Sequence, residues 1–165
     1  YGGFWRGLLG NWQPNYGAQP AAMFATYGFL HGGFMHLLVN MITLVSLGRL
    51  VIERVGQWRF VLIYALSLLG GAAGFAAFSA AVQPMVGASG ALFGLVGALV
   101  GWEYTARRLA HEGIGPVLRV IGLLVMLNAI MYWAMDGNLA WETHLGGFLA
   151  GWASSRCLPA LTEAG

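Results

Sequence analysis

Long apolar stretches separated by short polar connectors make up most of the chain. A membrane-spanning helix needs roughly 20 mostly apolar residues. Stretches of about this length predict five spanning helices, over residues 34–52, 60–81, 86–104, 117–135 and 141–158. The apolar residues form continuous runs, whereas an outer-membrane barrel would alternate apolar and polar residues. We therefore predict an all-α, polytopic transmembrane helical bundle.

The segment before these helices, residues 1–30, has a different composition. It contains Trp5, Trp12 and Tyr16 together with Pro14 and Pro20. Trp and Tyr are enriched where a membrane meets water. We predict an interfacial loop here. The chain has no internal repeat and no linker, so we predict one membrane domain over residues 1–165.

The composition restricts the possible partners. Hydrophobic residues make up 58% of the chain and charged residues 8%, against roughly 25% charged residues in a soluble domain. Membrane lipids are therefore expected to surround the protein. The formal net charge is only +2, and no basic face is present to follow a phosphate backbone, which argues against nucleic acid as a partner.

The single cysteine, Cys157, cannot form an internal disulfide, and its apolar surroundings predict that it is buried.

The arginines predict the orientation, because basic residues stay on the cytoplasmic side. Those after residue 30 lie around the first and third connectors and at the end of the last helix: Arg49, Arg54, Arg59, Arg107, Arg108, Arg119 and Arg156. The first, third and fifth predicted helices therefore begin on the outer side. Short connectors favour a bacterial cytoplasmic membrane.

Polar residues within predicted spans are candidates for function, because they are costly in lipid. Those near the outer helix starts are His36, Asn40, Ser89 and His144. A serine becomes a good nucleophile when a base within about 3 Å accepts its proton. We predict that Ser89 is the nucleophile and His144 the base.

The neighbours of these two residues fit that prediction. Small residues at Gly87 and Gly90 leave room for a substrate carbonyl, and Gly147 and Gly151 give the helix of His144 a smooth face for close packing. Phe93, one turn after Ser89, is placed to stack on the imidazole.

His36 and Asn40, four residues apart on one helix face, can both donate hydrogen bonds. With the backbone N–H of Ser89 they form a predicted oxyanion hole. No acidic residue is placed to orient His144, so we predict a dyad without a third member. A simpler interpretation also exists for each residue: a lone serine bonds to its own helix, a lone histidine joins two helices, and Asn128 and His31 are structural.

Three motifs together resemble the rhomboid intramembrane serine proteases. They are the segment from His31 to Asn40, the Gly-x-Ser-Gly of residues 87–90, and the His-Leu-Gly-Gly that begins at His144. The resemblance implies that Ser89 is the nucleophile, that His144 is the base and that His36 and Asn40 serve the oxyanion hole. It further implies a sixth helix before Tyr1, a water-filled cavity open to the outer side, and single-span membrane proteins as substrates.

The chain departs from the family pattern at two places. Many members carry a Trp-Arg pair where this chain has Ala22 and Met23, and a Tyr often occupies the position of Phe93. The ring of Phe93 can still stack, but it lacks the hydroxyl with which a Tyr would form a hydrogen bond.

Other classes of function are less well supported. A zinc site built from His31, His36 and His144 would lack a nearby carboxylate, so we expect no metal and no cofactor. A transporter or channel would show intramembrane charges or two similar halves with broken helices. The alternative that stays open is a catalytically inactive rhomboid-like protein that binds membrane clients.

Overall fold

The computed structural model describes residues 1–161, and every regular element among them is helical. The prediction of an all-α helical bundle is confirmed. The last four residues of the predicted domain lie outside the described part. The helices are two short 3-10 turns and six α-helices: η1 (Arg6–Leu9), α1 (Gln19–Thr26), η2 (Tyr27–Phe29), α2 (Phe34–Val55), α3 (Gln57–Phe78), α4 (Ser89–Leu109), α5 (Gly115–Ala134) and α6 (Trp141–Cys157).

The five long helices fall on the five predicted stretches, with shifted ends. α4 begins at Ser89, three residues later than predicted, because Gly87 before it has φ of 123°, a value outside the helical region. It continues to Leu109, where the ion pair between Glu103 and Arg107, 2.7 Å apart, supports its last turns. Gly56, with φ of 80°, separates α2 from α3.

Three helices of the described chain, α2, α3 and α5, are long and apolar enough to cross a membrane. α4 and α6 are not among them. α4 has charged residues near its end, and α6 has only 17 residues and includes Glu142 and Arg156. Five crossings therefore remain a prediction.

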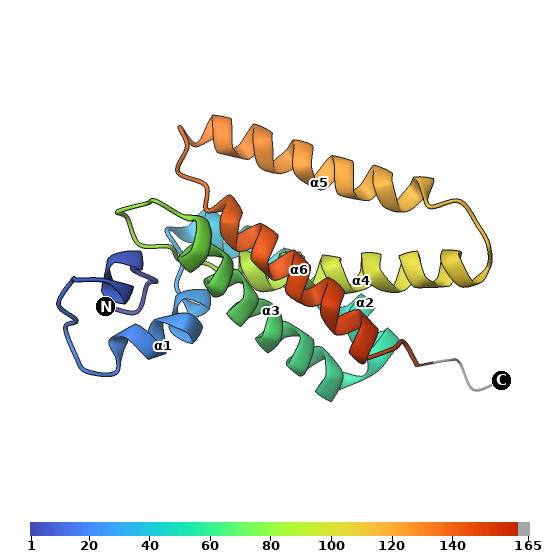
Figure 1. The fold of residues 1–165 in the computed structure, drawn as a ribbon, viewed down its shortest axis with the longest axis horizontal. Coiled ribbons are helices and arrows are strands. Elements are labelled where there is room, and N and C mark those ends of the chain that lie inside the picture. Colours follow the sequence, from blue (N-terminus) through green and yellow to red (C-terminus); the bar gives the residue numbers. More distant parts are fainter. Residues whose placement is uncertain (162–165) are drawn as a thin grey trace.

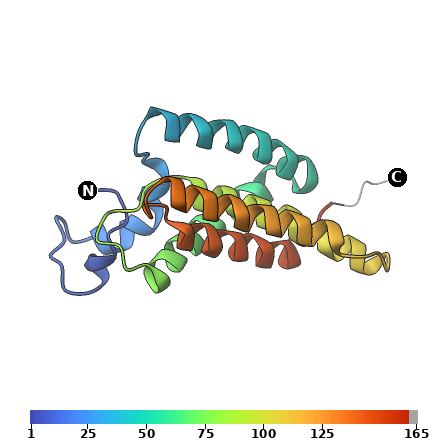
Figure 2. The ribbon, with the colours of Figure 1, turned by 90° about the horizontal axis from the view of Figure 1, so that it is seen from above.

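α3, α4 and α6 form the centre of the bundle, and α2 and α5 flank it (Figures 1 and 2). α6 packs extensively against both α4 and α3, whereas α5 lies apart along one side and makes few contacts with α4. In the view from above, α2 lies along one edge of the molecule and α6 toward the opposite edge, while α5 runs across the front. The start of α4 and the start of α6 lie at the same end of the bundle.

Glycines allow the backbones of α4 and α6 to touch. A methyl group added at Gly147 would collide with the carbonyl of Gly90, and one added at Gly151 would collide with the carbonyl of Gly94. In lipid, where no hydrophobic drive brings helices together, such close backbone packing is a main source of association. We call these four residues the glycine seam.

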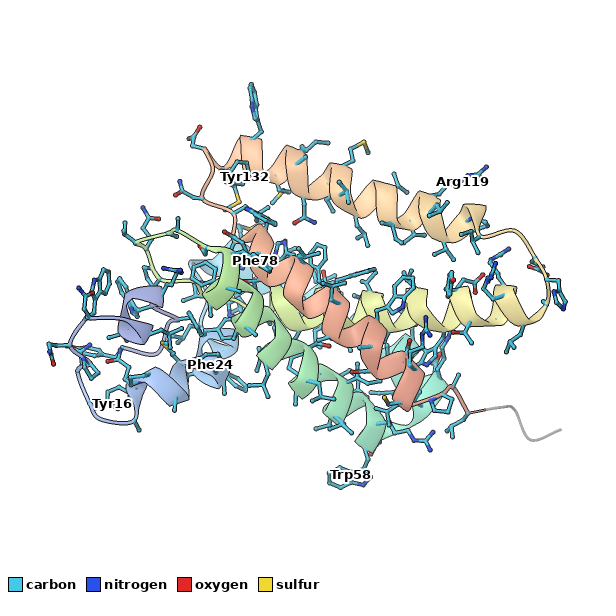
Figure 3. All side chains as sticks on the ribbon, in the orientation of Figure 1. Tyr16, Phe24, Trp58, Phe78, Arg119 and Tyr132 are labelled. Atoms are coloured by element: carbon cyan, nitrogen blue, oxygen red, sulfur yellow. The ribbon has the colours of Figure 1, made fainter. Side chains whose placement is uncertain are left out.

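The N-terminal segment is more ordered than the predicted loop. It contains α1 and both 3-10 turns, and Phe4, Met23 and Tyr27 are fully buried in a core cluster with residues of α3 and α4. Backbone hydrogen bonds in both directions join Phe4 to Met85. Figure 3 shows the aromatic side chains of this segment, among them Phe24, whose ring lies edge-on to Phe4 at 4.9 Å. At the opposite end of the chain, Cys157 is exposed and not buried as predicted, because α6 ends there.

Candidate active site

Ser89 and His144 meet at one end of the glycine seam. Ser89 is the first residue of α4, and His144 lies in the first turn of α6. The Oγ atom of Ser89 lies 2.9 Å from Nε2 of His144, a normal hydrogen-bond distance. Because the seam holds the two backbones in contact at Gly90, directly after Ser89, and at Gly147, one turn after His144, it fixes the separation of these side chains.

Phe93 covers one face of the imidazole. The rings of Phe93 and His144 are stacked, with centroids 4.2 Å apart and an angle of 7° between their planes. Phe93 lies four residues after Ser89 on α4, so both point towards α6. The His144 side chain is thereby restrained at its face as well as at its edge, and the residue is only 8% exposed.

His36 lies beside the turn that leads into Ser89. A methyl group added at Gly87 would come within 2.8 Å of His36 Nε2 and 3.9 Å of Ser89 Oγ. The other ring nitrogen, Nδ1, accepts a hydrogen bond of 3.2 Å from the backbone N–H of Gly32. In a neutral imidazole with Nδ1 as acceptor, Nε2 carries the proton. His36 therefore presents an N–H donor to the space next to Ser89.

Asn40 and His31 are less directly involved. Asn40 is buried, and its Nδ2 donates to the carbonyl of His36 at 2.8 Å, which uses one of its two amide hydrogens. Within the described residues, no hydrogen bond links Asn40 to Ser89. The ring of His31 lies edge-on to that of His36 at 5.1 Å, and His31 Nε2 is buried without a described partner.

The turn before Ser89 is held by the N-terminal segment. The Gly87 N–H donates to the carbonyl of Tyr27 at 3.0 Å, and the Tyr27 hydroxyl donates to the carbonyl of Leu68 in α3 at 2.7 Å. Burial, and to a lesser extent the nearby Tyr64, raises the pKa of Tyr27 well above its usual range. Tyr27 therefore stays neutral and keeps its hydroxyl as a donor.

The contact to the remaining ring nitrogen of His144 corrects the sequence analysis. Oδ1 of Asn128, from α5, lies 2.6 Å from Nδ1 of His144. The sequence predicts a dyad without a third member and a structural Asn128, whereas the structure places the Asn128 amide against the His144 ring. The group that contacts Nδ1 is a neutral amide and not one of the acidic residues considered for this position.

The comparisons with known proteins agree with the fold and the motifs. A model of the family described as "Rhomboid domain" matches residues 19–160. The chain belongs to the rhomboid family.

The matched relatives of this rhomboid include proteins of a plant, a bacterium and a fungus. It is 38% identical over 125 residues to "RHOMBOID-like protein 5" of Arabidopsis thaliana, which covers 74% of this chain and 39% of the relative. It is 34% identical over 129 residues to "Rhomboid protease GluP" of Bacillus subtilis, covering 78% and 24%. "Rhomboid-type serine protease 2" of Emericella nidulans is 27% identical over 135 residues, covering 79% and 25%. The chain thus spans well under half of these relatives.

The rhomboid motifs account for Ser89, His144, His36 and Asn40, but not for Asn128. The signal that could have found it was its isolation: it is the only amide between Arg119 and Met135 in an otherwise apolar helix. In the described part of the chain, no group of three or more His, Cys, Asp or Glu side chains is arranged to hold a metal ion.

Proposed function

We propose that this chain is the core of an intramembrane serine endopeptidase that cleaves single-span membrane proteins. The observation that carries the proposal is the 2.9 Å contact between Ser89 Oγ and His144 Nε2 beneath the stacked ring of Phe93. Two relatives, from Bacillus subtilis and Emericella nidulans, carry the names of a rhomboid protease and a rhomboid-type serine protease. No cofactor is needed for this chemistry.

In the first half-reaction, Ser89 Oγ attacks the carbonyl carbon of the scissile peptide bond while its proton passes to His144 Nε2. The carbonyl oxygen becomes an oxyanion. The Ser89 backbone N–H, the Nε2–H of His36 and the free amide hydrogen of Asn40 are the groups we assign to bind it. The C–N bond then breaks, the leaving amine takes the proton from His144, and Ser89 carries an acyl group.

In the second half-reaction, water from the outer side gives its proton to His144 and attacks the ester carbonyl. Collapse of this intermediate returns the proton to Ser89 Oγ and releases the new carboxyl terminus. The starting enzyme is restored, and one water is consumed for each bond cut.

The wider setting belongs to the same proposal. Residues 1–165 form one rhomboid membrane domain with five spans in this stretch of chain, and the site opens on the outer side of a bacterial cytoplasmic membrane. The outer position of the site is supported by the arginines at the opposite helix ends, such as Arg54, Arg108 and Arg156.

The test is labelling of the detergent-purified protein with a fluorophosphonate, with the modified residue located by mass spectrometry. We expect labelling at Ser89, and loss of at least about 10³-fold in labelling rate and in cleavage of a single-span substrate for Ser89→Ala and for His144→Ala. Ser46→Ala is the matched control, because Ser46 only bonds to the carbonyl of Ile42 in its own helix.

A folded wild-type protein that is not labelled and does not cleave would contradict the protease proposal. Co-purification of a single-span protein with that inactive wild type would then favour the client-binding alternative.

A further inference from the structure

We infer that Asn128 is a positioning residue that holds His144 in the tautomer able to accept the Ser89 proton. The inference rests on the proposed function, in which His144 acts as the base. It concerns a helix, α5, from which the family motifs of this chain take no residue.

The direction of the Asn128 amide follows from its two hydrogen bonds. Nδ2 donates to the carbonyl of Leu124, one turn earlier in α5, at 2.9 Å. A carbonyl accepts hydrogen bonds and cannot donate one, so the amide nitrogen has to face Leu124. The amide oxygen consequently faces His144 Nδ1, at 2.6 Å.

The direction of the amide fixes the proton on the imidazole. Oδ1 of Asn128 is an acceptor only, so Nδ1 of His144 carries the hydrogen in this contact. In the neutral ring, Nε2 is then left with its lone pair, and that lone pair faces the Ser89 hydroxyl at 2.9 Å. The other tautomer would place a hydrogen on Nε2, which could donate to Ser89 but could not accept its proton.

A neutral amide suits the surroundings of this histidine. The residues on either side of Asn128, Leu127 and Ala129, are exposed on a helix with the composition of a membrane span. A carboxylate at this depth would be costly to bury. An amide provides the same acceptor geometry without a charge, but it stabilises the imidazolium formed during the reaction less than a carboxylate does.

The main test compares Asn128→Leu, which keeps the size but removes the acceptor, with Asn128→Asp, which keeps an acceptor oxygen. A carboxylate that holds the tautomer in a soluble serine protease contributes about 10⁴-fold to kcat. For the neutral amide we expect a loss on the order of 100-fold in the Ser89 labelling rate and in kcat for Asn128→Leu, with KM unchanged. Asn128→Asp should retain at least about a tenth of the wild-type rate, with activity shifted towards higher pH because the carboxylate favours the imidazolium.

A swap variant, Leu127→Asn with Asn128→Leu, is the matched control. It keeps the composition of α5 but moves the amide one residue around the helix, where it no longer faces His144. We expect it to be as slow as Asn128→Leu. Asn128→Leu and the swap variant should melt within a few degrees of wild type in detergent, since Asn128 lies on a largely exposed helix.

Nitrogen NMR of protein labelled at histidine gives a readout that a purely structural role would not change. In wild type, the His144 signal, assigned by its loss in His144→Ala, should show a protonated Nδ1 and an unprotonated Nε2. In Asn128→Leu it should shift towards a mixture of tautomers. This measurement does not depend on catalysis, so it separates failure of the inference from failure of the proposed function.

The inference is overturned if folded Asn128→Leu labels within about threefold of wild type, or if the wild-type ring carries its proton on Nε2. If wild type is not labelled at all, the proposed function fails, and the tautomer measurement still decides what Asn128 does to His144.

Discussion

α6 and α5 both contribute to the surroundings of His144, but they are held in opposite ways. α6 is pressed against α4 along the glycine seam, where the backbones touch. Within α5, all of which is described, Val117 is the one buried residue, and the described link to His144 is a single hydrogen bond that Asn128 Oδ1 accepts. The Ser89–His144 distance therefore depends on backbone packing, while we infer that the tautomer of the histidine ring depends on one side chain of a loosely packed helix.

Gly147→Ala is expected to have the largest effect on stability, because it disturbs the packing of α6 against α4. The added methyl group would collide with the backbone carbonyl of Gly90, which cannot rotate away as a side chain could. Overpacking typically costs 1–3 kcal/mol, and we expect about 3 kcal/mol here because the obstacle is backbone. Unfolding by SDS in mixed micelles, followed by circular dichroism, measures it. Full stability of this variant would show that the seam does not hold α6.

Phe93→Ala should have a smaller effect, on rate more than on stability. The stacked ring at 4.2 Å restrains the His144 imidazole, and an aromatic pair is worth about 0.5–1.5 kcal/mol. Up to about tenfold slower labelling of Ser89 is expected. Phe93→Tyr keeps the stacking and is the control, expected within about twofold of wild type. Equal rates for Phe93→Ala and wild type would mean that the ring is held without this contact.

Gly122→Ala should have the smallest effect. It makes the same substitution in α5 that Gly147→Ala makes in α6, so the two variants compare the packing of these helices directly. A methyl group at Gly122 meets no atom within 4 Å. Ala also suits a helix interior better than Gly by roughly 0.5–1 kcal/mol. We expect unchanged or slightly higher stability in the same SDS titration. A loss close to that of Gly147→Ala would contradict the description of α5 as loosely packed.

Features that depend on local sequence could be predicted, whereas features that depend on packing against distant residues could not. The long apolar runs determine the helices, because their length and hydropathy are local properties. Helix ends were less accurate, since the start of α4 depends on the positive φ of Gly87 and its end on the ion pair of Arg107. The N-terminal segment was predicted as a loop because the burial of Phe4 and Met23 depends on distant residues of α3 and α4.

Only part of the candidate site could likewise be predicted from the sequence. Ser89 and His144 could be paired from their shared depth and from glycines at helical spacing on both helices. Asn128 could not, because α5 is apolar on all sides, and nothing in its periodicity indicates which face turns inward. The depth of a polar residue can be estimated by counting along a helix, whereas its rotation about the helix axis requires packed neighbours.

The paired hydrogen bonds between Phe4 and Met85 have a consequence for biosynthesis. They join the beginning of the chain to the turn before Ser89, and the Gly87 N–H is bound to Tyr27 in the same region. A ribosome releases Phe4 and Tyr27 long before Met85, and two helices, α2 and α3, must be made in between. The N-terminal segment therefore lacks these hydrogen bonds until Met85 and Gly87 have been synthesised. The hydroxyl of Ser89 meets His144 later still, because α6 is synthesised after α4 and α5.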